Sequence, residues 1–213
     1  MTQHLIVEGK DYHFIGALCS HHFPRPSGFS EKTERQFLKG GGGYTETLNT
    51  FIDAFDNIEL TNIGLIVDAD FGALNARFSA IIAALSKRLD CDLSKYTLNT
   101  EGVTIVEKDL PTIGIWIMPD NTHNGYLEYF IEQLIEKEDD MLALAKSTVE
   151  EIMKQKYCRF TDLKKQKALI HSWLAWQETP GLPFGTALKA GYLNPQKDAL
   201  QPFLNWIGRS FQF

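Results

Sequence analysis

The sequence predicts an α/β protein with a mainly parallel sheet, helices on both faces, a β-hairpin insertion and a C-terminal helical appendage. Strand-like and helix-like stretches alternate over the first 135 residues, as expected of a parallel sheet with helical crossovers. The clearest strand is Ile63–Val67, a β-branched apolar run too short for a stable helix. Beyond residue 137 the pattern is helical. We therefore expect an α/β domain over residues 1–137 and a helical extension, packed on it, over residues 138–213.

The remaining elements follow from the spacing of apolar residues. Leu48, Phe51 and Phe55 recur at three and four residues, which is typical of an amphipathic helix. The predicted strands are His4–Val7, Arg35–Leu38, Ile63–Val67 and Thr112–Met118, and the predicted hairpin covers Lys95–Lys108. The predicted helices are Tyr12–His21, Thr45–Phe55, Phe71–Leu89, Tyr126–Lys137, Asp140–Lys156, Asp162–Trp176 and Leu200–Trp206.

Composition narrows the class of protein. With 213 residues and 44% hydrophobic residues, the chain can bury a substantial core. No apolar run approaches the roughly 20 residues of a membrane span, and the N-terminus lacks a secretion-signal pattern. The three cysteines are far apart and odd in number. These features favour a cytoplasmic protein without a membrane partner.

Charge bears on nucleic-acid binding. The net charge of −6 argues against coating nucleic acid by bulk electrostatics, although a nuclease can neutralise phosphate locally with a metal ion. The stretch from Lys154 to Lys167 is strongly basic and contains Asp162 as its single acid. It is either a contact for the phosphate backbone or a solvated helix face. Its candidate nucleic-acid-binding residues are Lys154, Lys156, Arg159, Lys164 and Lys165, and Lys167 follows them.

Acidic residues follow the predicted strands. Glu8, Asp68, Asp70 and Asp120 each come directly after a strand, and Glu128 lies in the next helix. Because the carboxyl ends of parallel strands meet at one edge of a sheet, we expect these side chains to gather there. Such a cluster repels itself unless a cation neutralises it, and carboxylates are ligands for Mg²⁺, with Mn²⁺ as a substitute. The alternative is a set of unrelated acids that end strands and cap helices.

Four motifs follow one another along the chain: Glu8-Gly9-Lys10, the glycines Gly40–Gly43, Asp68-Ala69-Asp70 and Gly125-Tyr126-Leu127-Glu128. In this order they resemble the Toprim domain, which is shared by type IA and II topoisomerases, bacterial primases, OLD-type nucleases and small recombination mediators. The resemblance is strongest to bacterial proteins of unknown function with an OLD-like Toprim domain, and it covers about residues 4–135.

The resemblance implies a Mg²⁺-dependent enzyme that cleaves phosphodiester bonds of DNA or RNA. It implies that Glu8 acts as general acid or base or joins the metal shell. Lys10 is a candidate catalytic contact to phosphate, or else a simple ion-pair partner. The metal candidates are Asp68, Asp70, Asp120 and Glu128. The backbone N–H groups of Gly41, Gly42 and Gly43 could bind phosphate, or these glycines form only a flexible turn.

The chain departs from the Toprim pattern in two places. The acid that often lies four residues after the first glutamate is replaced by Tyr12, and Asp11, one residue earlier, is given no metal role. The glycine usual three residues after the second aspartate is Ala73. No Gly-Lys-Ser/Thr phosphate loop of a fused ATPase is present.

Two other functions remain open from the sequence. The first is a catalytically silent Toprim-fold module that needs a protein partner for activity, a reading favoured by the net acidity. The second is a phosphatase or receiver-like domain, which ranks lower because neither needs a glutamate closing the first strand. The sequence leaves open whether the chain forms a homo-oligomer.

Overall fold

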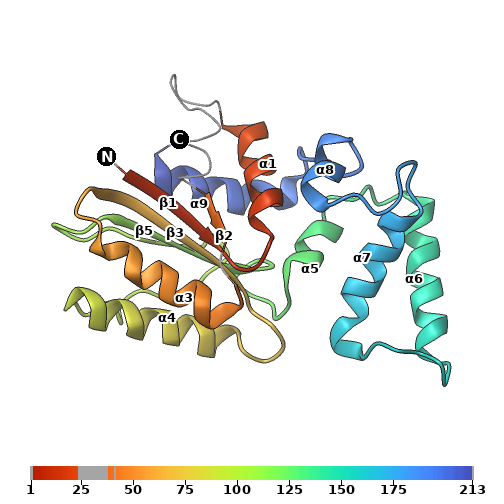
Figure 1. Ribbon diagram of the computed structural model, residues 1–213, viewed down its shortest axis with the longest axis horizontal. Coiled ribbons are helices and arrows are strands. Elements are labelled where there is room, and N and C mark those ends of the chain that lie inside the picture. The colour runs from red at the N-terminus through yellow and green to blue at the C-terminus, as the bar shows by residue number, and fades with distance from the viewer. Residues whose placement is uncertain (1, 24–37, 41, 213) are drawn as a thin grey trace.

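A mainly parallel five-stranded sheet forms the centre of the protein in a computed structural model that describes residues 2–23, 38–40 and 42–212 (Figure 1). The strand order is β2-β1-β3-β5-β4, and every pairing is parallel except that of β4 with β5. The predicted α/β class with a mainly parallel sheet is therefore confirmed. The strands are β1 (Thr2–Val7), β2 (Leu38–Gly40), β3 (Leu60–Asp68), β4 (Val103–Ile105) and β5 (Thr112–Met118).

Helices cover both faces of the sheet. Figure 1 shows α3 and α4 on one face and α1 and α9 on the other, while α6 and α7 form a hairpin to one side. None of the helices in the described residues is long and apolar enough to cross a bilayer. The helices are α1 (Tyr12–His22), α3 (Tyr44–Asp53), α4 (Leu74–Leu89), α5 (Leu127–Glu132), α6 (Asp140–Met153), α7 (Lys165–Ala175), α8 (Phe184–Lys189) and α9 (Gln201–Phe211), with short 3₁₀ turns η1 (Ala54–Asp56), η2 (Asp162–Lys164) and η3 (Asp198–Leu200).

Alternate residues of β1, β3 and β5 enter two separate apolar clusters. Ile6 of β1 packs in the cluster that contains Phe51 of α3, whereas its neighbours Leu5 and Val7 pack with Trp116 and the helices of the other face. This is the period of two expected of a strand buried on both sides.

The last helix, α9, packs directly on the sheet. The Asn62 Nδ2 atom donates a hydrogen bond to the Ser210 carbonyl at 2.8 Å, and the Trp206 indole donates to the Val103 carbonyl at 3.1 Å. Gly114 of β5 permits this contact, because a Cβ there would lie 2.5 Å from the Ser210 hydroxyl oxygen. Residues near the C-terminus therefore complete the core beneath β3, β4 and β5.

The antiparallel strand pair predicted within Lys95–Lys108 forms instead between β4 and β5. A turn does form, with Gly102 N donating to Asn99 O at 3.0 Å and Gly102 at φ +71°. Only the arm after the turn is a strand, and this strand, β4, pairs with β5. Pairing with β5 buries Val103 and Ile105 almost fully, which explains why that arm alone joins the sheet.

Several helical boundaries also differ from prediction, and the helix predicted at Leu200–Trp206 continues as α9 to Phe211. The helix expected at Tyr126–Lys137 ends at Glu132, after which turns with i→i−3 hydrogen bonds keep Leu134 and Ile135 buried. The helix expected from Phe71 begins at Leu74. Helix α8 was not predicted. Pro183 lies at its N-cap. Of the strand predicted at Arg35–Leu38, only Leu38 falls within the described residues, where β2 begins.

Candidate functional site

A short antiparallel bridge holds the loop after β3 against the loop before α5. Asp70 N donates to Gly125 O at 2.8 Å, and Gly125 N donates to Asp70 O at 3.1 Å. Asp70 adopts φ +51° and Gly125 φ +152°, so this crossing uses backbone conformations that most residues avoid. The bridge places the Asp68-Ala69-Asp70 segment beside the start of the helix that carries Glu128.

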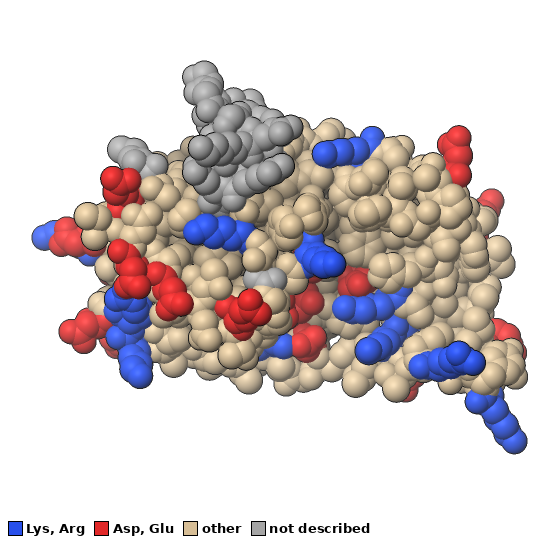
Figure 2. Space-filling view, in the orientation of Figure 1, with Lys and Arg blue, Asp and Glu red and all other residues tan. Residues whose placement is uncertain are grey.

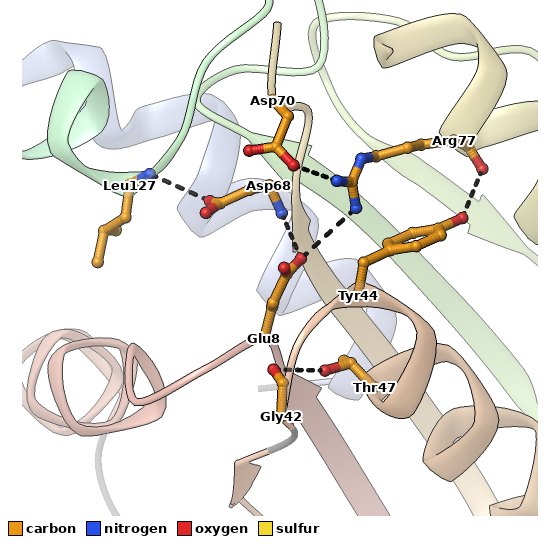
Figure 3. Close-up of polar contacts among 8 residues, drawn as sticks. All are labelled: Glu8, Gly42, Tyr44, Thr47, Asp68, Asp70, Arg77 and Leu127. Carbon is orange, nitrogen blue, oxygen red and sulfur yellow. Dashed lines mark hydrogen bonds and ion pairs between the residues drawn. The ribbon is translucent and has the colours of Figure 1, made fainter. Parts of the chain in front are cut away.

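Glu8 meets Asp68 at the carboxyl edge of the sheet. Glu8 directly follows β1 and Asp68 ends its parallel neighbour β3, and Asp68 N donates to Glu8 Oε2 at 3.1 Å. The Asp68 Oδ1 atom accepts a hydrogen bond from Leu127 N at 3.1 Å. Figure 3 shows the side chains of Glu8, Asp68 and Asp70 close to one another at this edge. The structure therefore brings together side chains from β1, β3 and the loop after β3.

Arg77 of α4 supplies the positive charge next to two of these acids. Its guanidinium forms an ion pair with Asp70, and its Nη1 atom lies 3.8 Å from Glu8 Oε2 (Figure 3). The same group stacks 4.0 Å from the centre of the Tyr44 ring. The Nε and Nη1 atoms of Arg77 are buried and have no hydrogen-bond acceptor among the described residues. Arg77 thus lies where a cation shared by Glu8 and Asp70 would be held.

The sequence analysis missed Arg77, although a signal was present. Arg77 lies in the first turn of α4, where the helix dipole disfavours a positive charge. A basic residue in that position needs an acidic partner, and Asp70 lies seven residues earlier. Helix position combined with charge could therefore have linked the two residues.

Asp11 and Glu128 complete the acidic cluster. Burial raises the pKa of Asp68 to about 8, and the charges of Asp11, Glu8 and Glu128 add to the effect. Burial likewise raises the pKa of Asp11 to about 7, helped by Glu128 and Glu8. Burial also raises the pKa of Glu8, although the Asp68 amide and Arg77 oppose the shift. Asp11, to which the sequence analysis gave no role, therefore belongs electrostatically to the site.

Helix α7 from the C-terminal part of the chain contacts this cluster. The Lys167 Nζ and His171 Nε2 atoms each lie 3.8 Å from Glu128 Oε1. Lys167 is also the positive charge that lowers the pKa values of both Asp68 and Asp11. Gln166 Nε2 donates to the Glu128 carbonyl at 3.4 Å. The helical extension therefore forms one side of the site.

The predicted basic residues lie along the α6–α7 hairpin. Figure 2 shows Lys and Arg side chains in a row over this hairpin, running from the acidic group near the middle of the molecule. Lys154 pairs with Glu151 at 3.2 Å, and Lys165 pairs with Glu150 at 3.2 Å. The side chains of Lys156, Arg159 and Lys164 are exposed.

Asp120 is held within its own turn. Its Oδ1 atom accepts hydrogen bonds from Thr122 N at 3.0 Å and His123 N at 2.9 Å, and its Oδ2 atom lies 2.8 Å from His123 Nδ1. Burial raises its pKa, but these hydrogen bonds outweigh burial and leave the pKa lowered. Its hydrogen bonds thus stay within the turn after β5.

The glycine-rich turn meets the first motif through its backbone. Gly42 O accepts hydrogen bonds from Gly9 N at 2.9 Å and Thr47 Oγ1 at 3.3 Å (Figure 3). Gly43 is the N-cap of α3, and the Glu46 carboxylate covers the side of Gly42 where a Cβ would lie. Gly41 lies outside the described residues, and Lys10 is exposed in the turn after β1.

The donor chemistry of the cluster fits a hard divalent cation. Asp68 carries a pKa raised to about 8 beside three further acids, and a divalent cation would relieve this repulsion. As arranged, no three His, Cys, Asp or Glu side chains of the described residues form a group that could hold a metal ion. Asp68, Asp70, Glu128 and Glu8 would have to reorient, with Arg77 leaving its position between Glu8 and Asp70.

Fold and site define the class: an α/β protein with an acidic site at the carboxyl edge of a mainly parallel sheet. Within that class, the chain belongs to a family described as "Protein of unknown function (DUF3226)", whose profile matches residues 2–212. Comparison with curated proteins and with solved structures gave no match.

Proposed function

We propose that the chain is a Mg²⁺-dependent, nuclease-type enzyme of the Toprim fold that cleaves phosphodiester bonds of DNA or RNA. The observation that carries this proposal is the hydrogen bond from Asp68 N to Glu8 Oε2, which joins the first and third acidic motifs. The five acids of the site, Glu8, Asp11, Asp68, Asp70 and Glu128, would be hard to keep ionised so near each other without a bound cation. The order of the four motifs along the chain also supports the proposal of a Toprim-fold nuclease.

Asp68, Asp70 and Glu128 would hold the metal ion. When bound, the ion neutralises charge on the phosphate and leaving-group oxygens. Glu8 is the residue for proton transfer, because burial raises its pKa toward the range of a general acid or base. Arg77, once free of Asp70, can donate to a phosphate oxygen through its buried N–H groups.

A cleavage assay with metal titration tests the proposal. The purified protein is incubated with plasmid and single-stranded substrates in Mg²⁺, Mn²⁺ or EDTA, and Mg²⁺ binding is measured by calorimetry. Asp70→Asn should abolish metal binding and cleavage while the fold remains intact, because asparagine removes the carboxylate but keeps an acceptor for Arg77 and tolerates φ +51°. Asp56→Asn is the matched control, since this exposed carboxylate pairs with Arg88, away from the site. Absence of both cleavage and metal binding in the wild type would reject the enzyme.

A second candidate is the catalytically silent module that requires a protein partner. The position of Arg77 favours it, because an arginine that already neutralises Glu8 and Asp70 can serve in place of a metal ion. Native mass spectrometry and pull-down distinguish the two functions. A stable heteromer together with an isolated chain that binds no Mg²⁺ supports the module. Metal-dependent cleavage by the isolated chain rejects it.

A further inference from the structure

An aromatic cluster lies next to the acidic site. The Phe71 ring contacts Tyr126 edge-on at 5.8 Å and Tyr129 edge-on at 6.5 Å, and the two tyrosine rings are 5.2 Å apart. Edge contacts at these distances fix the orientation of a ring. Phe71 nevertheless remains 42% exposed, so part of its surface is open to a ligand.

The backbone bridge between Asp70 and Gly125 links this cluster to the acids. Phe71 directly follows Asp70, and Tyr126 directly follows Gly125, so the two aromatic residues flank the bridged pair. Adjacent Cα atoms are about 3.8 Å apart, so the backbone of Phe71 lies directly beside that of Asp70. Gly72, which follows Phe71, adopts φ +76°, a left-handed conformation that favours glycine. The position of Phe71 is therefore set by the same loop that positions the metal candidates.

Positive charge lies beside the cluster. The Lys167 ammonium group is 4.7 Å from the centre of the Tyr126 ring, and the Tyr126 hydroxyl donates to the Leu163 carbonyl at 2.9 Å. These contacts bring the basic start of α7, with Lys164 and Lys165, next to the aromatic rings. Rings for stacking and lysines for the backbone are the two components of a single-strand binding surface.

We propose that Phe71 is a stacking platform for an unpaired base of single-stranded nucleic acid whose backbone passes the acidic site. This inference rests on the proposed function and adds the strandedness of its substrate. A duplex keeps its bases stacked on each other, and exposing one costs a few kcal/mol. A single strand presents its bases without that penalty, and every base has a face that can stack on a phenylalanine.

Binding of labelled oligonucleotides by Phe71→Ala tests the proposal. Fluorescence anisotropy compares a single strand with a duplex of the same length, with EDTA and with Ca²⁺ in place of Mg²⁺, and a gel checks that both stay intact. Phe71→Ala should weaken single-strand binding about 5- to 150-fold, because stacking contributes roughly 1–3 kcal/mol per base. Duplex binding should change less than about twofold, and Phe71→Trp should retain single-strand affinity.

Trp176→Ala is the control, because Trp176 is a similarly exposed aromatic side chain at the end of α7. Unchanged single-strand binding by Phe71→Ala overturns the inference, and the exposed Phe71 ring would then be assigned to contact with another protein. An equal loss on duplex overturns it as well, as does a wild type that binds no single strand. The nuclease proposal is judged separately: binding that depends on Phe71, in a protein that neither cleaves nucleic acid nor binds Mg²⁺, supports the stacking platform and rejects the enzyme.

Discussion

The Asp68 amide donates a hydrogen bond to the Glu8 carboxylate at 3.1 Å, which joins two strand ends sixty residues apart. The contact exists because β1 and β3 are parallel neighbours whose register pairs Val7 with Ile66. It also lowers the pKa of Glu8, although burial, the larger effect, leaves that pKa raised. The fold therefore holds acids together at an electrostatic cost, and that cost makes its stability sensitive to pH.

The metal-free protein should lose stability as pH rises from about 4 to about 8. Burial raises the pKa of Asp68 to about 8 and that of Asp11 to about 7, from an ordinary aspartate pKa of 3.8 for both. The folded state therefore binds more protons than the unfolded state in this window. Each such group can lower the unfolding free energy by at most about 1.4 kcal/mol per pH unit. Urea denaturation in EDTA at a series of pH values measures the slope.

Asp68→Asn should flatten this pH dependence, because asparagine keeps an acceptor for Leu127 N but carries no charge. Asp56→Asn should leave the slope unchanged, since Asp56 is exposed. Mg²⁺ competes with protons for the same oxygens and should stabilise the wild type more at about pH 8 than at about pH 5. An Asp68→Asn slope equal to that of the wild type would contradict the electrostatic account.

Replacement of Arg77 should destabilise the metal-free protein yet strengthen Mg²⁺ binding. Arg77→Gln leaves Glu8 and Asp70 without their shared positive charge, and Arg77 is only 13% exposed. We expect a loss of about 1–3 kcal/mol in EDTA. The same change removes a cation that competes with the metal ion, so Mg²⁺ should bind more tightly in calorimetry.

Arg88→Gln is the control on the same helix, because Arg88 pairs with Asp56 at the surface. This variant should change the unfolding free energy by less than about 1 kcal/mol and leave Mg²⁺ affinity unaltered. Weaker Mg²⁺ binding by Arg77→Gln would show that Arg77 supports the metal site instead of competing with the ion.

Local pattern was enough to predict the strands that end at Glu8 and Asp68, because an apolar run followed by an acid is visible in the chain itself. The contacts of Arg77 depend on how α4 lies on the sheet, which no local pattern states. Asp11 joins the acids only once β1, β3 and α5 are assembled in space. Asp120 illustrates the converse: it follows a strand as predicted, but its own turn supplies its hydrogen-bond donors.

Removal of the Lys167 charge should raise the pKa values of the acidic cluster further. Lys167 lowers the pKa of both Asp68 and Asp11, and its Nζ atom lies 3.8 Å from Glu128. In Lys167→Met, NMR titration of the carboxyl carbons should show both steps shifted to higher pH, as properties of the coupled group. Lys165→Met should leave them in place, since Lys165 pairs with Glu150. Unshifted titration steps in Lys167→Met would show that α7 does not act on the charges of the acidic cluster.

Two glycine substitutions should change stability in opposite directions if α9 packs on the sheet as described. A Cβ at Gly114 of β5 would lie 2.5 Å from the Ser210 hydroxyl oxygen and 3.0 Å from Trp206, so Gly114→Ala must push α9 away. We expect a loss of about 1–3 kcal/mol, typical of overpacking. Gly208 lies within α9 with no atom within 4 Å of an added Cβ, so Gly208→Ala should gain about 0.5–1 kcal/mol from helix propensity. Urea denaturation measures both, and a neutral Gly114→Ala would mean that the end of the chain does not cover β5.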